Sequence, residues 1–87
     1  MIKVKFVGLA HLTNGEKELT LEASCILDIL EEMKKRYAQF RERMVNPKTG
    51  ELYPEFIITV NGKPLYNYTK KLNDGDVVAI LPIFAGG

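Results

Sequence analysis

The first residues of the chain alternate between apolar and charged side chains. Ile2, Val4 and Phe6 are separated by two lysines, a spacing that places the apolar side chains on one face of a β-strand. A second alternating segment, residues 18–23, follows a Thr-Asn-Gly turn signal at residues 13–15. The two segments predict a β-hairpin at the start of the chain.

A helical periodicity follows the second strand. Apolar residues recur there at steps of three and four, which is typical of one buried stripe of an α-helix. They are Ile26, Leu30, Met33, Tyr37, Phe40 and Met44. Ser24 is a favourable N-cap, so the pattern predicts a helix over about residues 25–40. The turn-rich stretch over residues 41–54 is predicted to be a surface loop.

The last third of the chain predicts three further strands. Residues 56–60 alternate, Asn61-Gly62 is a strong hairpin signal, and a short return strand is expected to begin at Leu65 and Tyr66. Because a proline cannot donate a ladder hydrogen bond, Pro64 places that strand at a sheet edge. Residues 77–81 are apolar at every position, which predicts a strand buried in the middle of the sheet, beside the first strand.

This order of elements provides one main helix for one sheet. The helix can cover only one face, so the fold class is predicted to be α+β with two layers. The domain is expected to span residues 1–82, and residues 83–87 are expected to form a flexible tail.

The composition of the chain mainly excludes classes of partner and of binding site. A chain of 87 residues allows one domain, and a net charge of +1 provides no global field for collecting nucleic acid or anionic membranes. One cysteine and one histidine exclude an internal disulfide and a zinc ribbon. No apolar run approaches the ~20 residues of a membrane-spanning helix. We therefore expect a cytoplasmic protein with no metal site, no membrane contact and no nucleic-acid partner.

Few side chains are candidates for a catalytic or binding role. His11 is expected in a surface loop, and Cys25 at the start of the helix is either a packing residue or part of a sulfur relay. Lys70 and Lys71 either meet acidic groups on a partner or occupy an exposed turn.

The end of the sequence carries the strongest candidate chemistry. An apolar run near a terminus indicates a partner surface, and an aromatic residue in it is a typical anchor. The candidate docking residues are Leu81, Pro82, Ile83 and Phe84, with Phe6 and Val78 as possible extensions. Leu81 and Ile83 could instead complete the core. Gly86 and Gly87 lack a Cβ atom, which allows a backbone to pass through a narrow channel.

The Val60-Asn61-Gly62 turn, the stretch Leu-Asn-Asp-Gly-Asp-Val-Val-Ala over residues 72–79 and the Gly86-Gly87 pair resemble the ubiquitin-like sulfur carriers of the MoaD/ThiS type, especially the small subunit of molybdopterin synthase. The resemblance implies a β-grasp fold, with a mixed sheet of about four to five strands and one main helix on one face.

The resemblance also implies a function for Gly87. Its carboxylate would be adenylated by a MoeB/ThiF-like enzyme that uses ATP and then converted to a thiocarboxylate. The chain would donate sulfur in molybdenum or tungsten cofactor biosynthesis as a non-catalytic partner of the large synthase subunit, and would bind no cofactor itself. A ubiquitin-like protein modifier or a tRNA-thiolation carrier would use the same activated terminus, and the sequence does not separate these functions.

Overall fold

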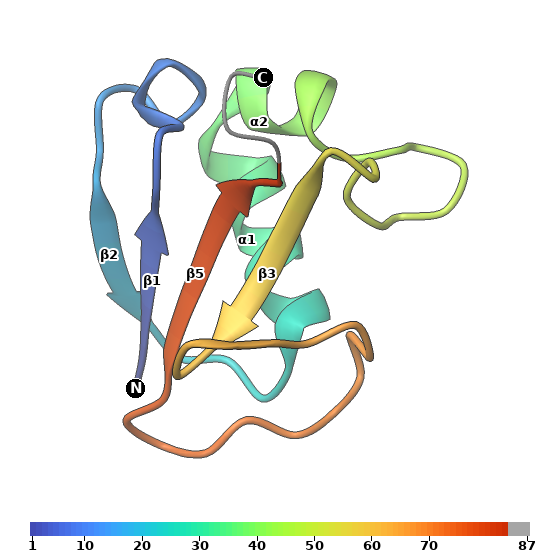
Figure 1. Ribbon diagram of the computed structural model, residues 1–87. Coiled ribbons are helices and arrows are strands. Elements are labelled where there is room, and N and C mark those ends of the chain that lie inside the picture. Colours follow the sequence, from blue (N-terminus) through green and yellow to red (C-terminus); the bar gives the residue numbers. More distant parts are fainter. Residues whose placement is uncertain (84–87) are drawn as a thin grey trace.

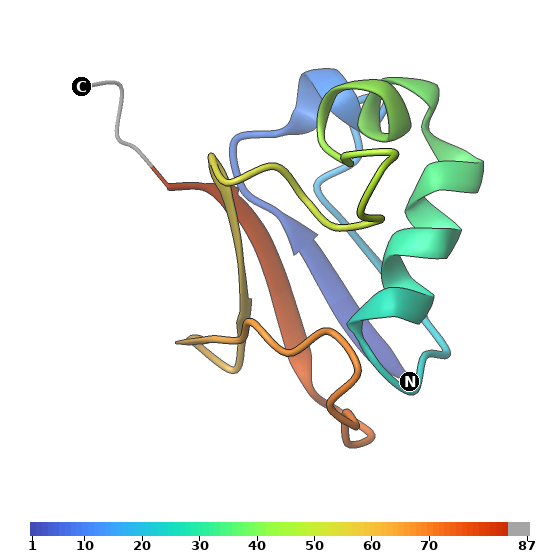
Figure 2. The same ribbon diagram turned by 90° about the vertical axis from the view of Figure 1, so that its right-hand side faces the viewer.

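Five strands form one mixed sheet, and two helices cover one of its faces (Figures 1 and 2). The computed structural model describes residues 1–83. In chain order, the elements are β1 (Ile2–Phe6), a 3-10 helix η1 (Ala10–Leu12), β2 (Glu18–Leu21), α1 (Ile26–Arg36), α2 (Ala38–Arg43), β3 (Phe56–Val60), β4 (Lys63–Pro64) and β5 (Val77–Pro82). The strand order is β2-β1-β5-β3-β4.

Strand β5 occupies the centre of the sheet, as its apolar sequence predicted. It pairs in parallel with β1 and antiparallel with β3. An unbroken apolar run is typical of a strand that is buried on both faces or flanked on both sides, and only the second description applies to β5. Val78 and Ile80 are fully buried beneath the helices, whereas Val77, Ala79 and Leu81 point to the opposite face and stay half-exposed. Helices cover one face only, so alternate apolar residues of β5 remain open to solvent (Figure 2).

The core lies between the sheet and the helices. The alternation of β1 is confirmed, because its three apolar side chains are buried and its two lysines are exposed. From the helical segment, the buried residues are Ile26, Ile29, Leu30, Met33, Tyr37, Phe40 and Met44. This apolar layer is the main stabilising feature of a domain of this size.

The predicted helical stripe is confirmed, but the continuous helix is not. Tyr37 has φ −128° and ψ 106°, an extended conformation that separates α1 from α2. Its hydroxyl donates a 2.9 Å hydrogen bond to Glu16, and its ring packs edge-on against Phe6 with centroids 5.9 Å apart. Periodicity therefore identified the buried face, but it did not predict the extended backbone of Tyr37 that divides the helix.

We expect Tyr37→Phe to lower the free energy of unfolding by about 1 kcal/mol at neutral pH, because it removes the hydrogen bond to Glu16. Burial, followed by that hydrogen bond, raises the pKa of Tyr37 from 10.0 to about 12. The folded state then holds the phenol proton more tightly than the unfolded chain, so this stabilisation is lost as the pH rises from 10 toward 12. Urea titrations across that pH range measure the free energy of unfolding of the unaltered chain and of Tyr37→Phe. A variant whose free energy of unfolding depends on pH as strongly as that of the unaltered chain would contradict the prediction.

Two predicted loops are more ordered than expected. In residues 41–54, α2 continues to Arg43, and an antiparallel bridge joins the buried residues Val45 and Leu52. The connector after β1 contains the unpredicted η1, although the Asn14-Gly15 turn is confirmed by positive φ angles of 55° and 84°. Short helical turns and single bridges leave too little periodicity in a sequence to be recognised.

The return strand after β3 also begins earlier than predicted. Asn61 and Gly62 have φ angles of 53° and 86°, which suits a tight hairpin turn. Pairing therefore resumes at once, in β4, rather than at Leu65 and Tyr66. The edge position expected from Pro64 is confirmed.

Candidate functional site

Strand β5 leads directly to the predicted reactive segment. Leu81 and Pro82 are half-exposed, and Ile83 is 58% exposed. The backbone N–H of Ile83 donates a 2.8 Å hydrogen bond to the carbonyl of Glu55, which fixes this residue beside the start of β3. The candidate residues Phe84, Gly86 and Gly87 lie outside the described residues. The described part of the chain thus positions the three residues that precede them at one end of the sheet.

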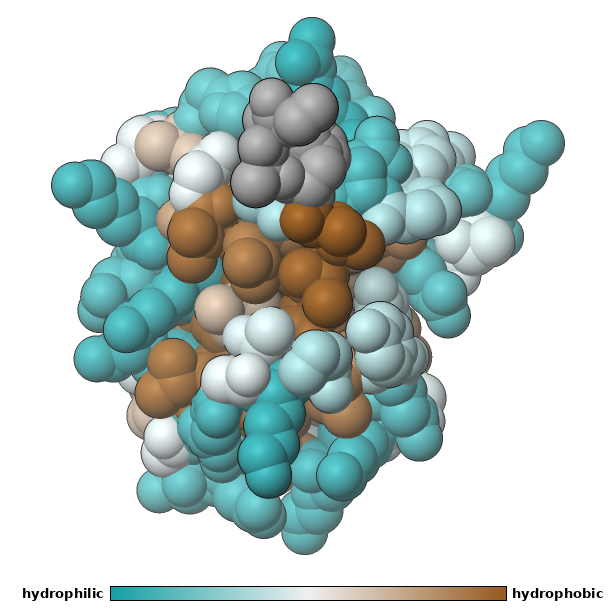
Figure 3. All heavy atoms as spheres, viewed as in Figure 1, coloured by the Kyte–Doolittle hydropathy of each residue, from teal (hydrophilic) through white to brown (hydrophobic). Residues whose placement is uncertain are grey.

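An apolar patch covers this end of the open sheet face. Leu81 lies opposite Ile57 in the β3–β5 register, and Val7 lies beside β5, where its N–H bonds to the carbonyl of Ile80 at 3.0 Å. We call Val7, Ile57, Leu81 and Ile83 the open-face patch. Figure 3 shows apolar surface gathered over these strands and polar side chains around it. Val7 is 49% exposed, so the patch presents contact area to a partner.

Two residues predicted to extend the docking surface lie elsewhere. Phe6 is 5% exposed and Val78 is 0% exposed, because both point into the core beneath the helices. Val7 and Ile57 take their place on the open face, and sequence reasoning missed them. The alternation of side chains along each strand could have identified them, since Val7 follows the buried Phe6 and Ile57 precedes the buried Ile58.

A groove of about 400 Å³ adjoins the patch at the end of β5. Leu9, Phe56 and Pro82 supply apolar lining, and the cationic side chain of Arg43 lies beside them. His11, which was expected in a loop, is exposed on η1 and also lines this groove. A partner that held the residues after Ile83 would meet this hollow as well as the open-face patch.

The described side chains offer little catalytic chemistry of their own. Within residues 1–83, no cluster of three or more histidine, cysteine or acidic side chains is placed to hold a metal ion. Cys25 is the half-buried N-cap residue of α1 and makes no side-chain capping bond. In the same part of the chain, no helix is long and apolar enough to cross a membrane. The candidate site in the described residues is therefore the open-face patch and the groove beside it, rather than a set of catalytic side chains.

The sheet order, the helices on one face and the exit of the chain from the central strand define a ubiquitin-like β-grasp domain. The chain belongs to the ThiS family, whose model matches residues 4–87. Its fold and family are those of the MoaD/ThiS-type ubiquitin-like sulfur carriers, as the sequence motifs indicated. A search of curated proteins finds no significant match.

Solved structures give the same fold over the whole domain. A chain of the Amycolatopsis orientalis BexX/CysO complex is 26% identical, with 100% of both chains covered and a TM-score of 0.81. Urm1 of Sulfolobus solfataricus is 26% identical, with 93% of this chain and 99% of Urm1 covered and a TM-score of 0.75. A Pyrococcus furiosus protein described as subunit 1 of a molybdopterin converting factor is 30% identical, with 93% and 94% covered and a TM-score of 0.67.

Proposed function

We propose that this chain carries sulfur as a thiocarboxylate on Gly87 and donates it in molybdopterin biosynthesis, as the small subunit of molybdopterin synthase. Membership of the ThiS family is the observation that carries the proposal. The 30% identity to the Pyrococcus furiosus protein described as a molybdopterin converting factor subunit supports this pathway. Residues 83–87 would be the segment that enters the partner enzymes.

The chemistry begins with the Gly87 carboxylate. One of its oxygens attacks the α-phosphorus of ATP on a MoeB/ThiF-like adenylating enzyme, forming an acyl adenylate and releasing pyrophosphate. Hydrosulfide then attacks the acyl carbon, so that the carbon–sulfur bond forms, the bond to the AMP oxygen breaks, and the thiocarboxylate and AMP are the products. The product is more nucleophilic than a carboxylate, so its sulfur attacks a precursor bound by the large synthase subunit. Hydrolysis of the acyl–sulfur bond then leaves the sulfur on the precursor and regenerates the Gly87 carboxylate. Gly86 would let the backbone pass through the channel that leads to the nucleotide.

A second function is favoured by other structural neighbours. Urm1 of Sulfolobus solfataricus is 26% identical, and small archaeal modifier protein 1 of Haloferax volcanii shares the fold at 19% identity with a TM-score of 0.73. A protein modifier would join the activated Gly87 to lysines of targets, and a tRNA-thiolation carrier would pass on its sulfur. Denaturing gels of cell extract, probed for this chain, reveal higher-mass conjugates only for a modifier.

Mass spectrometry tests the proposed activation directly. The chain is incubated with ATP, a sulfur source and the adenylating enzyme of its own cell. We expect the intact mass to rise by the difference between one sulfur and one oxygen atom, with the change mapped to the terminal peptide. An unmodified Gly87 under these conditions would overturn the proposal. Transfer of that sulfur to a pterin precursor on the large subunit then separates the molybdopterin pathway from the alternatives.

We expect Leu81→Asp to weaken binding of the adenylating enzyme by about tenfold or more, because a charge at the centre of the open-face patch must be desolvated in the complex. Leu81 is half-exposed rather than buried, so the domain should stay folded. Thr20→Asp, on the exposed polar edge of the same face, is the matched control. Binding is measured by calorimetry and folding by circular dichroism; equal affinities of the two variants would contradict this role of the patch.

A further inference from the structure

Three lysines line a groove at the end of the sheet where β5 begins. The groove has a volume of about 310 Å³ and is lined by β4 and by the segment that leads into β5. The ribbon of that segment runs through the lower part of Figure 1. Its apolar lining includes the half-buried Val60 and Leu65 and the buried Leu72. Its exposed cations are Lys63, Lys70 and Lys71. The groove therefore combines an apolar lining with positive charge.

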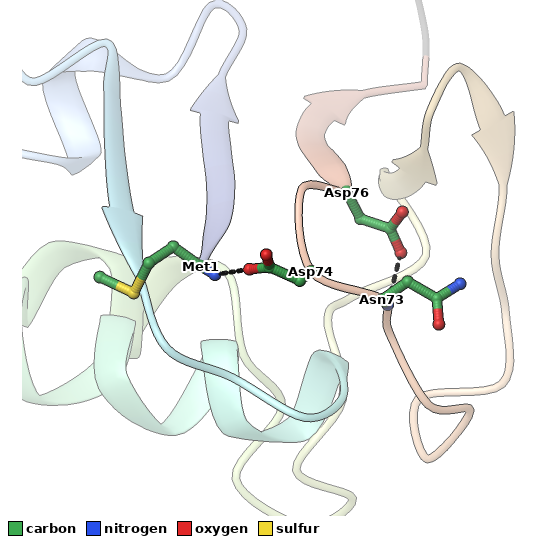
Figure 4. Close-up of polar contacts among 4 residues, drawn as sticks. All are labelled: Met1, Asn73, Asp74 and Asp76. Carbon is green, nitrogen blue, oxygen red and sulfur yellow. Dashed lines mark hydrogen bonds and ion pairs between the residues drawn. The ribbon is translucent and has the colours of Figure 1, made fainter.

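Both carboxylates in the segment leading into β5 are engaged by donors other than these lysines (Figure 4). Asp74 accepts a hydrogen bond from the backbone amino group of Met1. Asp76 accepts one from the backbone N–H of Asn73 at 2.8 Å and another from the side-chain amide of Asn61 at 2.9 Å. The first and then the second of these bonds hold the pKa of Asp76 below its ordinary value. Both of its oxygens are thus occupied by neutral amide donors.

No ion pair involves the three groove lysines among residues 1–83. Other lysines do find partners, since Lys34 pairs with Glu31 at 2.6 Å and Lys3 with Glu18 at 3.8 Å. Three lysine charges face the single carboxylate charge of Asp76 in this groove, so positive charge is in excess there and raises the local positive potential. The groove is consequently complementary to a ligand that carries several negative charges.

We propose that this groove docks a short acidic segment of a partner protein, whose carboxylates pair with the three lysines and whose apolar residue contacts the apolar lining. Leu65 and Leu72 can contact an apolar side chain of a peptide, whereas the phosphate backbone of a nucleic acid has no apolar group to place there. The net charge of +1 also provides no wider basic surface for a nucleic acid to follow. Pro64 removes a backbone donor from β4, so recognition runs through side chains rather than strand addition.

The position of the groove separates it from the proposed sulfur chemistry. Asp76 lines the groove and directly precedes β5, whereas Ile83 directly follows the six residues of that strand. Six residues of β-strand span roughly 20 Å, so a docked acidic segment would leave the open-face patch free. The proposal does not depend on activation of Gly87, and either can fail without the other.

The test is an NMR titration of the ¹⁵N-labelled full chain with a synthetic peptide. The probe is acetyl-Glu-Asp-Leu-Asp-Glu-amide, and its uncharged counterpart is acetyl-Gln-Asn-Leu-Asn-Gln-amide. We expect the acidic peptide to shift the amide signals of Lys63, Leu65 and Lys71, and raising the salt concentration to weaken binding several-fold. The uncharged peptide should leave these signals in place. Shifts that map to another face, or none at millimolar peptide, would overturn the proposal.

Charge reversal provides the matched comparison. The triple variant Lys63→Glu, Lys70→Glu, Lys71→Glu should lower the affinity for the acidic peptide about tenfold or more. A control triple, Lys17→Glu, Lys35→Glu, Lys48→Glu, makes the same change in net charge at exposed positions outside the groove.

We expect the control triple to bind nearly as the unaltered chain does. Equal losses in the two triples would show attraction by net charge alone and overturn the proposal. Groove binding by a uridine oligonucleotide in place of the peptide would overturn it as well. If the groove triple does not fold, replacement of the same lysines by glutamine makes the comparison.

Discussion

Addition of one alanine after Gly87 is expected to abolish thiocarboxylate formation, with the adenylation rate lowered about 100-fold or more. One residue displaces the carboxylate by about 3.5 Å, and a misplacement of about 1 Å already costs a reaction of this kind about 100-fold. Adenylation requires an oxygen atom of the Gly87 carboxylate in line with the α-phosphorus of ATP. An added residue moves the terminal carboxylate past that position. Pyrophosphate release and intact mass spectrometry measure the two steps separately.

The matched control is an alanine inserted between Lys48 and Thr49, two exposed residues in the turn of residues 46–51. An insertion at an exposed loop tip is tolerated well, so this variant should be activated at the rate of the unaltered chain. A plain binding module would keep partner affinity in both variants and form a thiocarboxylate in neither. Activation of the chain extended after Gly87 would contradict the assignment of its carboxylate as the reacting group.

The sequence predicted the buried side of the domain better than its open side. Alternation in β1 and the stripe that includes Met33 and Phe40 report burial, because a buried face tolerates few polar side chains. The uniform apolar run of β5 carried no such information. It placed the strand in the middle of the sheet but did not show which of its residues face solvent, and Leu81 is only half-buried. The type of an apolar residue does not show whether it contacts a partner or packs in the core.

The sequence predicted only part of the candidate site, again because the type of an apolar residue does not show whether it is buried or exposed. Leu81, Pro82 and Ile83 are accessible at the end of the sheet, as a docking role requires. Phe6 shares the parity of Ile2 and Val4, so the alternation itself placed it in the core, and its inclusion in the docking surface was wrong.

Contacts between residues far apart in the chain could not be anticipated at all. The pairing of Asp74 with the Met1 amino group joins groups 73 residues apart. The bond from Tyr37 to Glu16, which accompanies the interruption of the helix, joins groups 21 residues apart. Local periodicity carries no record of such pairs, because each depends on how the finished fold brings two distant segments together.

Replacement of Phe40 by alanine is expected to lower the free energy of unfolding by about 3–5 kcal/mol. Phe40 lies on α2 and is 0% exposed, one of the largest fully buried side chains among the described residues. Its removal loses the transfer free energy of the ring and leaves a cavity. A domain of this size has roughly 5–10 kcal/mol of stability in total, so the melting temperature should fall by more than about 10 °C.

Gln39→Ala, an exposed position on the same helix, is the matched control and should change the stability by less than about 0.5 kcal/mol. Equal effects of the two variants would mean that the Phe40 ring is not packed in the core. Well below its melting temperature, the Phe40→Ala variant should still form the thiocarboxylate at the rate of the unaltered chain. The helices cover the face opposite the open-face patch (Figure 2), so a cavity beneath them should lower stability without altering that patch.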